Sequence, residues 1–360
     1  DGSAYEAARV LGIPKYRQFT AITLPFLRKP LISVMFSIFT LIITDYGVPL
    51  MVGGKYTTIA TVMYQEVIGQ LDFGKGAAYG TILLIPAVIA FVADLTNKDR
   101  GNSGFVTKHC AISQNKAVIA VSLAACLLVA FVTLLPLVSF GLLAFATDYP
   151  SNLNVTLDNL QKAFNLKAGR YYVNSVLIAL CTAIAGVCIS FMTAYLSARM
   201  KSKLSRFLHL SAMTSAAIPG MVLGLSYVLV FNGTPIYGTI IVLVLVNVVH
   251  FIASSLSKIN ENLEGVAHTM GIRRAYLIRD VFIPQCKYTL MEMFSYFFVN
   301  CMMTISAVSF LASTKNKPVS LMINQFEAQM QLECAAVVSL MILGTNLLIK
   351  GTIHLLKKKQ

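Results

Sequence analysis

Charge is scarce in this chain of 360 residues. Only 12% of the residues are charged, about half the usual share in soluble proteins, whereas 56% are hydrophobic. A soluble protein of this size needs more charge on its surface, so the composition excludes a soluble enzyme. Tryptophan is absent, and Tyr and Phe must therefore supply any aromatic belt at a membrane interface.

Acidic residues are also few, with 15 Asp and Glu against 29 Lys and Arg and a net charge of +14. The basic residues lie between apolar runs, which favours contact with anionic membrane lipid rather than with nucleic acid. The seven cysteines are odd in number and include no CxxC, so neither a disulfide framework nor a zinc site is predicted. The five histidines lack HExxH-type spacing, and we expect no metal site or cofactor.

Eight apolar runs have about the 20 residues needed to cross the hydrocarbon core of a membrane. They are 31–51, 77–95, 117–145, 171–196, 207–231, 236–257, 289–311 and 334–355. Pro136 predicts a kink or tilt in the third run, and Pro219-Gly220 a break or bend in the fifth. The expected fold class is an all-α, polytopic membrane protein with eight transmembrane helices.

The basic residues predict the orientation of these spans. The segments 1–30, 96–116, 197–206, 258–288 and 350–360 hold 22 of the 29 Lys and Arg residues, and the alternate segments hold seven. Loops rich in Lys and Arg stay on the cytoplasmic side. We therefore expect both residue 1 and the C-terminal tail to be cytoplasmic.

An internal repeat relates the two ends of the chain. EAARVLGIPKYRQFTAITLP (6–25) aligns without gaps with GVAHTMGIRRAYLIRDVFIP (265–284), 259 residues later. The same register places span 31–51 on 289–311 and span 77–95 on 334–355. A single register that carries a motif and two spans indicates duplication.

The repeat also predicts the domain organisation. Residues 1–95 would be the last part of one unit with two spans, 96–116 a polar cytoplasmic linker, and 117–360 a second unit with six spans. The chain opens at Asp1 without an initiator Met, and the register would place the start of the first unit before it. We therefore expect a fragment of a longer protein.

The repeated motif predicts two short helices joined by a turn at the cytoplasmic surface. Glu6 and the alanines after it begin the first helix, and Gly12 can take a positive φ and end it. Pro14 and Pro25 are expected to bound the next segment. Such a surface could receive a partner protein, or it could rest on lipid as an amphipathic loop.

This pattern of Glu-Ala-Ala, three residues, Gly, and then Ile-x-Leu-Pro resembles the EAA coupling loop of permease subunits in binding-protein-dependent ABC importers. The residues that match it are Glu6, Ala7, Ala8, Gly12, Ile22, Leu24 and Pro25. The second copy keeps Ala267, Gly271 and Pro284 but has Gly265 in place of the Glu, with Glu264 one residue earlier. Two fused units are similar to the iron(III) and 2-aminoethylphosphonate importers.

The resemblance implies a type I ABC importer permease fold in the bacterial inner membrane. It further implies that ABC ATPase subunits bind both loops and that a periplasmic or lipoprotein solute-binding protein delivers the solute. The sequence contains no GxxxxGK[ST], so we expect ATP hydrolysis on partner subunits and no enzymatic activity in this chain.

Polar residues within the spans are costly in hydrocarbon and are therefore candidates for the solute pathway. The candidates are Asp45, Asn174, Asn247, His250, Asn300 and Thr304, together with Ser175 and Ser306. The uncharged residues could instead bond neighbouring helices, and Asp45 could lie solvated at the outer boundary. In the repeat, Asp45 corresponds to the neutral Thr304.

Loops 52–76 and 312–333 each predict an amphipathic helix, around 61–71 and 319–331. These helices could face a receptor or form a gate, or they could rest on lipid headgroups. Two other functions remain open: an ion-coupled secondary transporter with internal repeats and a structural membrane protein. The former would need carboxylates or broken helices in both halves.

Overall fold

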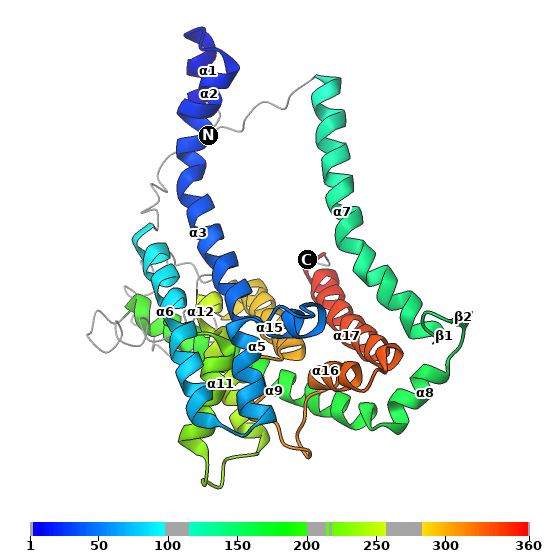
Figure 1. Ribbon diagram of the computed structural model, residues 1–360. Helices are drawn as coiled ribbons and strands as arrows, with labels where there is room; N and C mark the ends of the chain where they lie inside the picture. The colour runs from blue at the N-terminus through cyan, green and yellow to red at the C-terminus, as the bar shows by residue number, and fades with distance from the viewer. Residues whose placement is uncertain (1–2, 98–114, 200–213, 216–217, 257–282, 359–360) are drawn as a thin grey trace. The chain divides into compact units, whose positions relative to one another are not determined.

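The computed structural model describes residues 3–97, 115–199, 214–215, 218–256 and 283–358. Within these ranges the chain is mostly helical, as predicted (Figure 1). The first elements are α1 (Ser3–Val10), α2 (Lys15–Gln18), the π-helix η1 (Phe19–Thr23), α3 (Leu24–Thr44), α4 (Gly47–Val52), α5 (Ile59–Tyr64), η2 (Gln65–Gly69), α6 (Phe73–Asn97) and α7 (Lys116–Phe145). There follow β1 (Ala146–Asp148), β2 (Asn152–Val155), α8 (Asp158–Asn165), α9 (Ala168–Arg199), α11 (Gly220–Phe231), α12 (Ile240–Leu256), α14 (Ile283–Gln285), α15 (Lys287–Met303), α16 (Ser320–Ala328) and α17 (Leu332–Lys358).

Four described helices are long and apolar enough to cross a membrane: Phe73–Ala93, Lys116–Phe145, Ala168–Leu196 and Leu332–Lys357. The bent pair Lys15–Arg28 and Pro30–Thr44, whose parts meet at 51°, would be a fifth. The prediction of eight transmembrane helices is therefore not confirmed, although each of the eight apolar runs holds a helix. The others are short, because α11 begins only at Gly220 and has 12 residues, while α12 and α15 have 17 each.

A small β-hairpin departs from the all-α prediction. Strands β1 and β2 pair antiparallel directly after α7. The side-chain amide of the buried Asn159, on α8, donates to the carbonyl oxygens of Ala144 (3.3 Å) and Ala146 (2.6 Å). This side chain therefore fastens the base of the hairpin to the short helix that follows it.

The described chain forms two compact units. One consists of Asp1–Ile42 and Val88–Ser139, and the other of Ile43–Ala87 and Phe140–Gln360. In the second unit, α9 packs extensively against α12 and α15. A β-carbon added at Gly186 on α9 would lie 2.7 Å from ring atoms of Phe297 on α15, so a small residue permits this close packing.

The boundaries of the helices follow the register of the sequence repeat. Equivalent positions of the two copies are 259 residues apart. In the same register α3 and α15 end at Thr44 and Met303, and α6 and α17 begin at Phe73 and Leu332. The predicted loop helices are also present, as α5 with η2 and as α16.

Hydrogen bonds and backbone conformation follow this register too. The Leu50 N–H donates to the Tyr46 carbonyl oxygen (2.9 Å), and at the equivalent positions the Ser309 N–H donates to the Ile305 oxygen (3.1 Å). Leu71 and Met330 are equivalent, and both adopt a left-handed conformation, with φ of 56° and 57°. Side chains with a β-carbon rarely adopt this conformation, so its recurrence indicates a shared backbone path.

The helix after each of these left-handed residues begins differently in the two copies. In the first copy the Lys75 N–H donates to Asp72 Oδ1 (2.9 Å), which caps α6 and lowers the pKa of the Asp72 carboxyl. The second copy has the uncharged Gln331 at the position of Asp72. The backbone path is therefore shared, but the capping side chain is not.

Candidate functional site

The first repeated motif folds as the short helix α1 and a second helical segment, α2, joined by a turn at Gly12, as predicted, but the second segment continues into α3. The Ile13 N–H donates to the Ala8 carbonyl oxygen (2.9 Å), and the Gly12 N–H donates to the Arg9 oxygen (3.1 Å). This pair of bonds is the Schellman motif, in which the residue after the helix has a positive φ. Gly12 has a φ of +65°, which glycine adopts without the steric cost that other residues incur.

Side-chain hydrogen bonds hold the second helix against the first. Pro14 is the N-cap of α2, which agrees with its predicted role at the start of the segment. Tyr5 Oη and Thr23 Oγ1 are hydrogen-bonded at 2.6 Å, and Gln18 Nε2 donates to the Ile13 oxygen at 2.6 Å. The turn is therefore built into a hairpin of helices.

The prediction that Pro25 ends the second segment is wrong. Residues at the C-caps of α2 and η1 keep helical dihedral angles, and the helix continues into α3 through Pro25. Proline has no N–H and so removes one backbone hydrogen bond from this continuous helix, and the π-helical turn η1 lies directly before it. The bend of 51° falls instead between Arg28 and Pro30.

The hairpin presents a defined outer surface. Ala8 is buried, whereas Glu6 and Ala7 are exposed. Val10 and Leu11, just before the turn, are 88% and 73% exposed. The sequence analysis concentrated on the Glu-Ala-Ala motif and missed this apolar pair, although two large apolar residues beside a helix-ending glycine are a readable signal.

The second copy of the motif lies mostly outside the described residues. Glu264, Gly265, Ala267 and Gly271 fall within residues 257–282, whose structure is not described. Pro284 lies within the short α14 and is exposed. The prediction of a second coupling loop therefore stays a prediction.

Asp45 and Thr304 lie at equivalent helix ends. Asp45 follows the last residue of α3, and its Oδ1 accepts a hydrogen bond from the Gly47 N–H (3.0 Å). Thr304 follows the last residue of α15, and its Oγ1 donates to the Asn300 oxygen (2.6 Å). In both copies a polar side chain therefore satisfies backbone groups where an apolar helix stops.

Asn174 and Ser175 hold a loop rather than a cavity. The Asn174 amide donates to the Lys315 (3.0 Å) and Lys317 (3.5 Å) carbonyl oxygens, and Ser175 Oγ accepts from the Val319 N–H (2.7 Å). Lys317 Nζ donates to Gln325 Oε1 (2.6 Å), and burial lowers the pKa of the Lys317 ammonium. The Asn174 contacts are structural, but they bond α9 to a loop rather than to a neighbouring helix.

His250 comes close to Ser306, and Asn247 lies one turn earlier on the same helix, α12. A β-carbon added at Gly220 would lie 2.6 Å from Ser306 Oγ and 3.3 Å from His250 Nε2. Asn247 Oδ1 and His250 Nδ1 are buried and have no hydrogen-bond partner within the part of the chain that the structure describes. Buried polar atoms without partners are costly, so these two atoms are suited to form hydrogen bonds with water or with a passing solute.

The remaining pathway candidate, Asn300, bonds within its own helix. Its Nδ2 donates to the Tyr296 oxygen at 2.7 Å, and the side chain also lines a cavity between α15 and α17. The described residues include no group of three or more His, Cys, Asp or Glu placed to hold a metal ion.

An aromatic cluster that the sequence analysis missed joins the two repeated segments within the second unit. Tyr46, fully buried, stacks on Tyr64 with 4.6 Å between ring centroids, and Tyr64 lies 6.2 Å from Phe310. The Tyr46 and Ser309 hydroxyls are hydrogen-bonded. Tyr46 follows α3 and Ser309 follows α15, but their repeat equivalents are Ile305 and Leu50, so the register alone does not pair them.

Comparison with known proteins agrees with this architecture. A family described as the binding-protein-dependent transport system inner membrane component matches residues 1–98 and 186–360. The chain is 24% identical over 335 residues to the ferric transport system permease protein FbpB of Actinobacillus pleuropneumoniae, covering 88% of this chain and 48% of that protein.

Two further relatives are similar over different lengths. FbpB 1 of Haemophilus influenzae, described as a ferric transport system permease, is 24% identical over 88% of this chain and 53% of its own length. The osmoprotective compounds uptake permease protein GgtC of a Synechocystis species is 30% identical over 93 residues, which is 25% of this chain and 33% of that protein. The chain thus spans about half the length of the two ferric transport relatives. Because the family match covers most of its residues, the chain belongs to the family of inner membrane components of binding-protein-dependent transport systems and is a multi-pass membrane protein.

Proposed function

We propose that this chain is part of the membrane subunit of an ATP-driven ABC importer, and that it forms the solute pathway. The observation that carries the proposal is the helical hairpin of residues 3–18, which precedes a membrane-type helix in a chain of this family. The hairpin resembles the EAA coupling loop both in sequence and in its Gly12 turn. An amphipathic loop that only rests on lipid would not need a hydrogen-bonded turn such as the one at Gly12.

The hairpin is suited to dock an ATPase subunit from the cytoplasm. Glu6 offers a carboxylate, Ala7 leaves room for an approaching backbone, and Val10 and Leu11 offer apolar area. ATP hydrolysis takes place on the partner, because this chain lacks a phosphate-binding loop motif. A solute-binding protein delivers the solute at the opposite face, as the name of the family implies.

The chain carries two such loops through duplication. The shared helix boundaries and left-handed residues of the two copies support this proposal. We assign residues 1–95 to the first unit, 96–116 to a linker and 117–360 to the second unit, with the second loop at 258–288. Its Gly265 lacks a carboxylate, so Glu264 substitutes for Glu6 or the second contact has none.

Within the membrane we place the solute pathway beside His250. Asn247 and His250 offer buried polar atoms without partners in the described part of the chain, and His250 and Ser306 lie beside Gly220, whereas Asn174 is already bonded to the loop of residues 315–317. Asp45 and Thr304 directly follow the last residues of α3 and α15, at equivalent positions of the repeat. Broken helices that expose backbone groups near a polar site are common in transporters.

Ferric iron is the proposed solute, because the two long matches are ferric transport permeases. We expect cells with the full-length transporter to accumulate radioactive iron(III), and excess unlabelled 2-aminoethylphosphonate to leave this uptake unchanged. Arsenate, which depletes ATP, should stop uptake, whereas a protonophore in ATP-replete cells should have little effect. The measurement is cell-associated radioactivity, normalised to the amount of transporter in the membrane.

Each other result has a distinct meaning in this assay. Loss of uptake with the protonophore alone would favour the ion-coupled secondary transporter. Competition by 2-aminoethylphosphonate would transfer the substrate assignment to that compound and leave the importer proposal standing. If cells take up neither solute although their transporter still hydrolyses ATP, both assignments of solute would be rejected.

The proposed orientation can be tested by labelling single cysteines in a cysteine-free background. Arg9→Cys should be protected from a membrane-impermeant maleimide in intact cells, and Lys55→Cys and Lys315→Cys should react. All three residues are exposed on the described chain, so the differences would come from the membrane. His250→Cys should react with a small aqueous thiol reagent during turnover, and external labelling of Arg9→Cys would overturn the orientation.

A further inference from the structure

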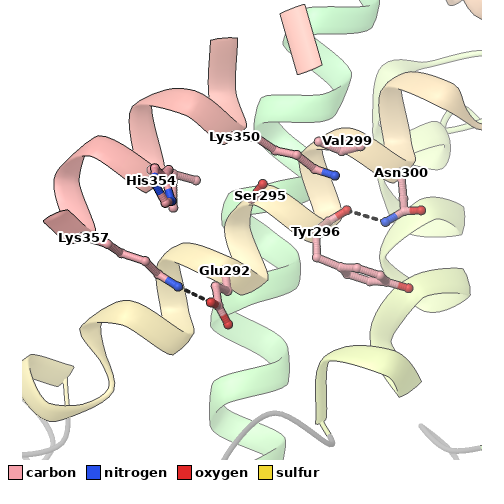
Figure 2. Close-up of a pocket in the computed structure, with 9 residues that line it drawn as sticks. Glu292, Ser295, Tyr296, Val299, Asn300, Lys350, His354 and Lys357 are labelled. Atoms are coloured by element: carbon pink, nitrogen blue, oxygen red, sulfur yellow. Dashed lines mark hydrogen bonds and ion pairs between the residues drawn. The ribbon is translucent and has the colours of Figure 1, made fainter. Parts of the chain in front are cut away.

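A cavity of about 340 Å³ opens between α15 and α17 (Figure 2). Glu292, Tyr296 and Asn300 line it from α15, and Lys350, His354 and Lys357 line it from α17. Lys357 is paired with Glu292, so the first turns of α15 meet the last turns of α17 and the two helices run antiparallel. The cavity therefore lies at one end of this helix pair.

The charge of the cavity is basic. The single carboxylate among its lining residues is occupied by Lys357. Within the described ranges, no acidic side chain is paired with Lys350, which projects toward the cavity in Figure 2. His354, one turn farther along α17, is exposed at the same opening. An anion between Lys350 and His354 would meet donors from both.

An exposed apolar surface adjoins the cavity at the end where Lys350 lies. Leu347 lies one turn before Lys350 on α17 and is 60% exposed, and Met303 lies one turn after Asn300 on α15 and is 59% exposed. Because the helices are antiparallel, both residues lie on the side of the cavity away from the ion pair. A basic pocket with an exposed apolar continuation matches a phospholipid rather than a free anion.

The repeat shows that these polar residues are not needed to form the two individual helices. The positions equivalent to Glu292, Lys350 and His354 in the first copy hold Ser33, Phe91 and Leu95. Helices nevertheless form in both copies, and α3 and α15 end, and α6 and α17 begin, at equivalent residues. The basic cavity is therefore a feature of the second copy alone, and ionisable residues inside a membrane span usually have a function.

We propose that this cavity binds the headgroup of an anionic phospholipid. Its phosphate contacts Lys350 and His354, and an acyl chain lies along Leu347 and Met303. The assignment to the cytoplasmic leaflet rests on the proposed orientation, in which the last turn of α17 is cytoplasmic. The preference for an anionic lipid does not depend on transport, solute or orientation.

Native mass spectrometry of the purified full-length transporter tests the site. We expect the wild-type protein to retain phosphatidylglycerol in preference to phosphatidylcholine with the same acyl chains. The double variant Lys350→Gln/His354→Gln should lose at least about fivefold in retained phosphatidylglycerol, since one Lys near a membrane surface contributes about 1 kcal/mol and tenfold corresponds to 1.4 kcal/mol. The matched control Lys162→Gln/Lys315→Gln removes two exposed charges elsewhere and should keep wild-type retention.

Three results would overturn the proposal. They are equal retention of both lipids by the wild type, wild-type retention by the double variant, and displacement of the lipid by millimolar inorganic phosphate, which would indicate a free-anion site. If the double variant does not fold, Lys350→Arg and Lys350→Gln give the comparison, with retention kept in the first and lowered in the second. Lipid retention is measured without solute or ATP, so a failed uptake assay would leave this result unaffected.

Discussion

Replacing Gly12 with proline should abolish transport while leaving insertion into the membrane intact. Proline fixes φ near −65°, whereas Gly12 has a φ of +65°, and proline also removes the N–H that donates to the Arg9 oxygen. The Schellman motif would be lost, and α1 could no longer fold back toward α2. Gly271→Pro, at the equivalent position of the second loop, should have the same effect.

The matched control is Gly12→Asn. Asparagine enters the left-handed region at a cost of about 1 kcal/mol, and a β-carbon at Gly12 would meet no atom within 4 Å. We therefore expect near-normal transport from this variant. The measurements are solute uptake per membrane-inserted transporter and ATPase activity of the purified complex. If Gly12→Pro stimulates the ATPase as the wild type does, the hairpin is not the coupling element.

Replacing Gly224 with alanine should remove most of the folded protein from the membrane. A β-carbon at Gly224, on the buried side of α11, would lie 2.5 Å from the Ala307 carbonyl oxygen. This neighbour belongs to the backbone and cannot rotate away, so the cost should reach about 3 kcal/mol, the upper end of the range for overpacking. That is a large share of the stability of a typical protein.

Gly344→Ala provides the control for this second prediction. Gly344 lies within α17, and a β-carbon there would meet no atom within 4 Å. Alanine favours helix over glycine by about 1 kcal/mol, so the variant should be neutral or slightly stabilised. The thermal unfolding midpoint and the membrane abundance of both variants are to be compared with the wild type. Equal midpoints for Gly224→Ala and the wild type would show that α11 does not pack closely on residue 307.

Some features of the fold could be predicted because they depend on local rules. Gly12 was expected to end a helix with a positive φ, and it does so. The loop helices around 61–71 and 319–331 are present as α5 with η2 and as α16. The repeat register, obtained from a few identical residues, also relates the ends of α3 and α15 and the starts of α6 and α17.

Other features could not be predicted because they depend on packing or on small local choices. Hydropathy counted residues 304–311 as part of a span, yet α15 stops at Met303, where Thr304 takes an extended conformation. Pro25 looked like a boundary, but the helical backbone continues from η1 through it into α3. The burial of Tyr46 against Tyr64 and Ser309 joins segments distant in sequence, and apolarity alone does not reveal such a contact.

The same limit applies to the proposed site. Composition selected Asn174, Asn247 and His250 equally, because each is a polar residue in an apolar run. Only coordinates separate Asn174, whose amide is bonded to a loop, from Asn247 and His250, whose buried atoms lack partners in the described part of the chain. The distinction depends on neighbours that the sequence does not identify.

The paired left-handed residues bear on how α6 and α17 leave their loops. Leu71 and Met330 have different side chains, and neither is the glycine that this conformation favours, yet they share φ values of 56° and 57°. The two loops therefore give α6 and α17 the same local backbone turn at their starts, although a different amino acid occupies that turn in each copy.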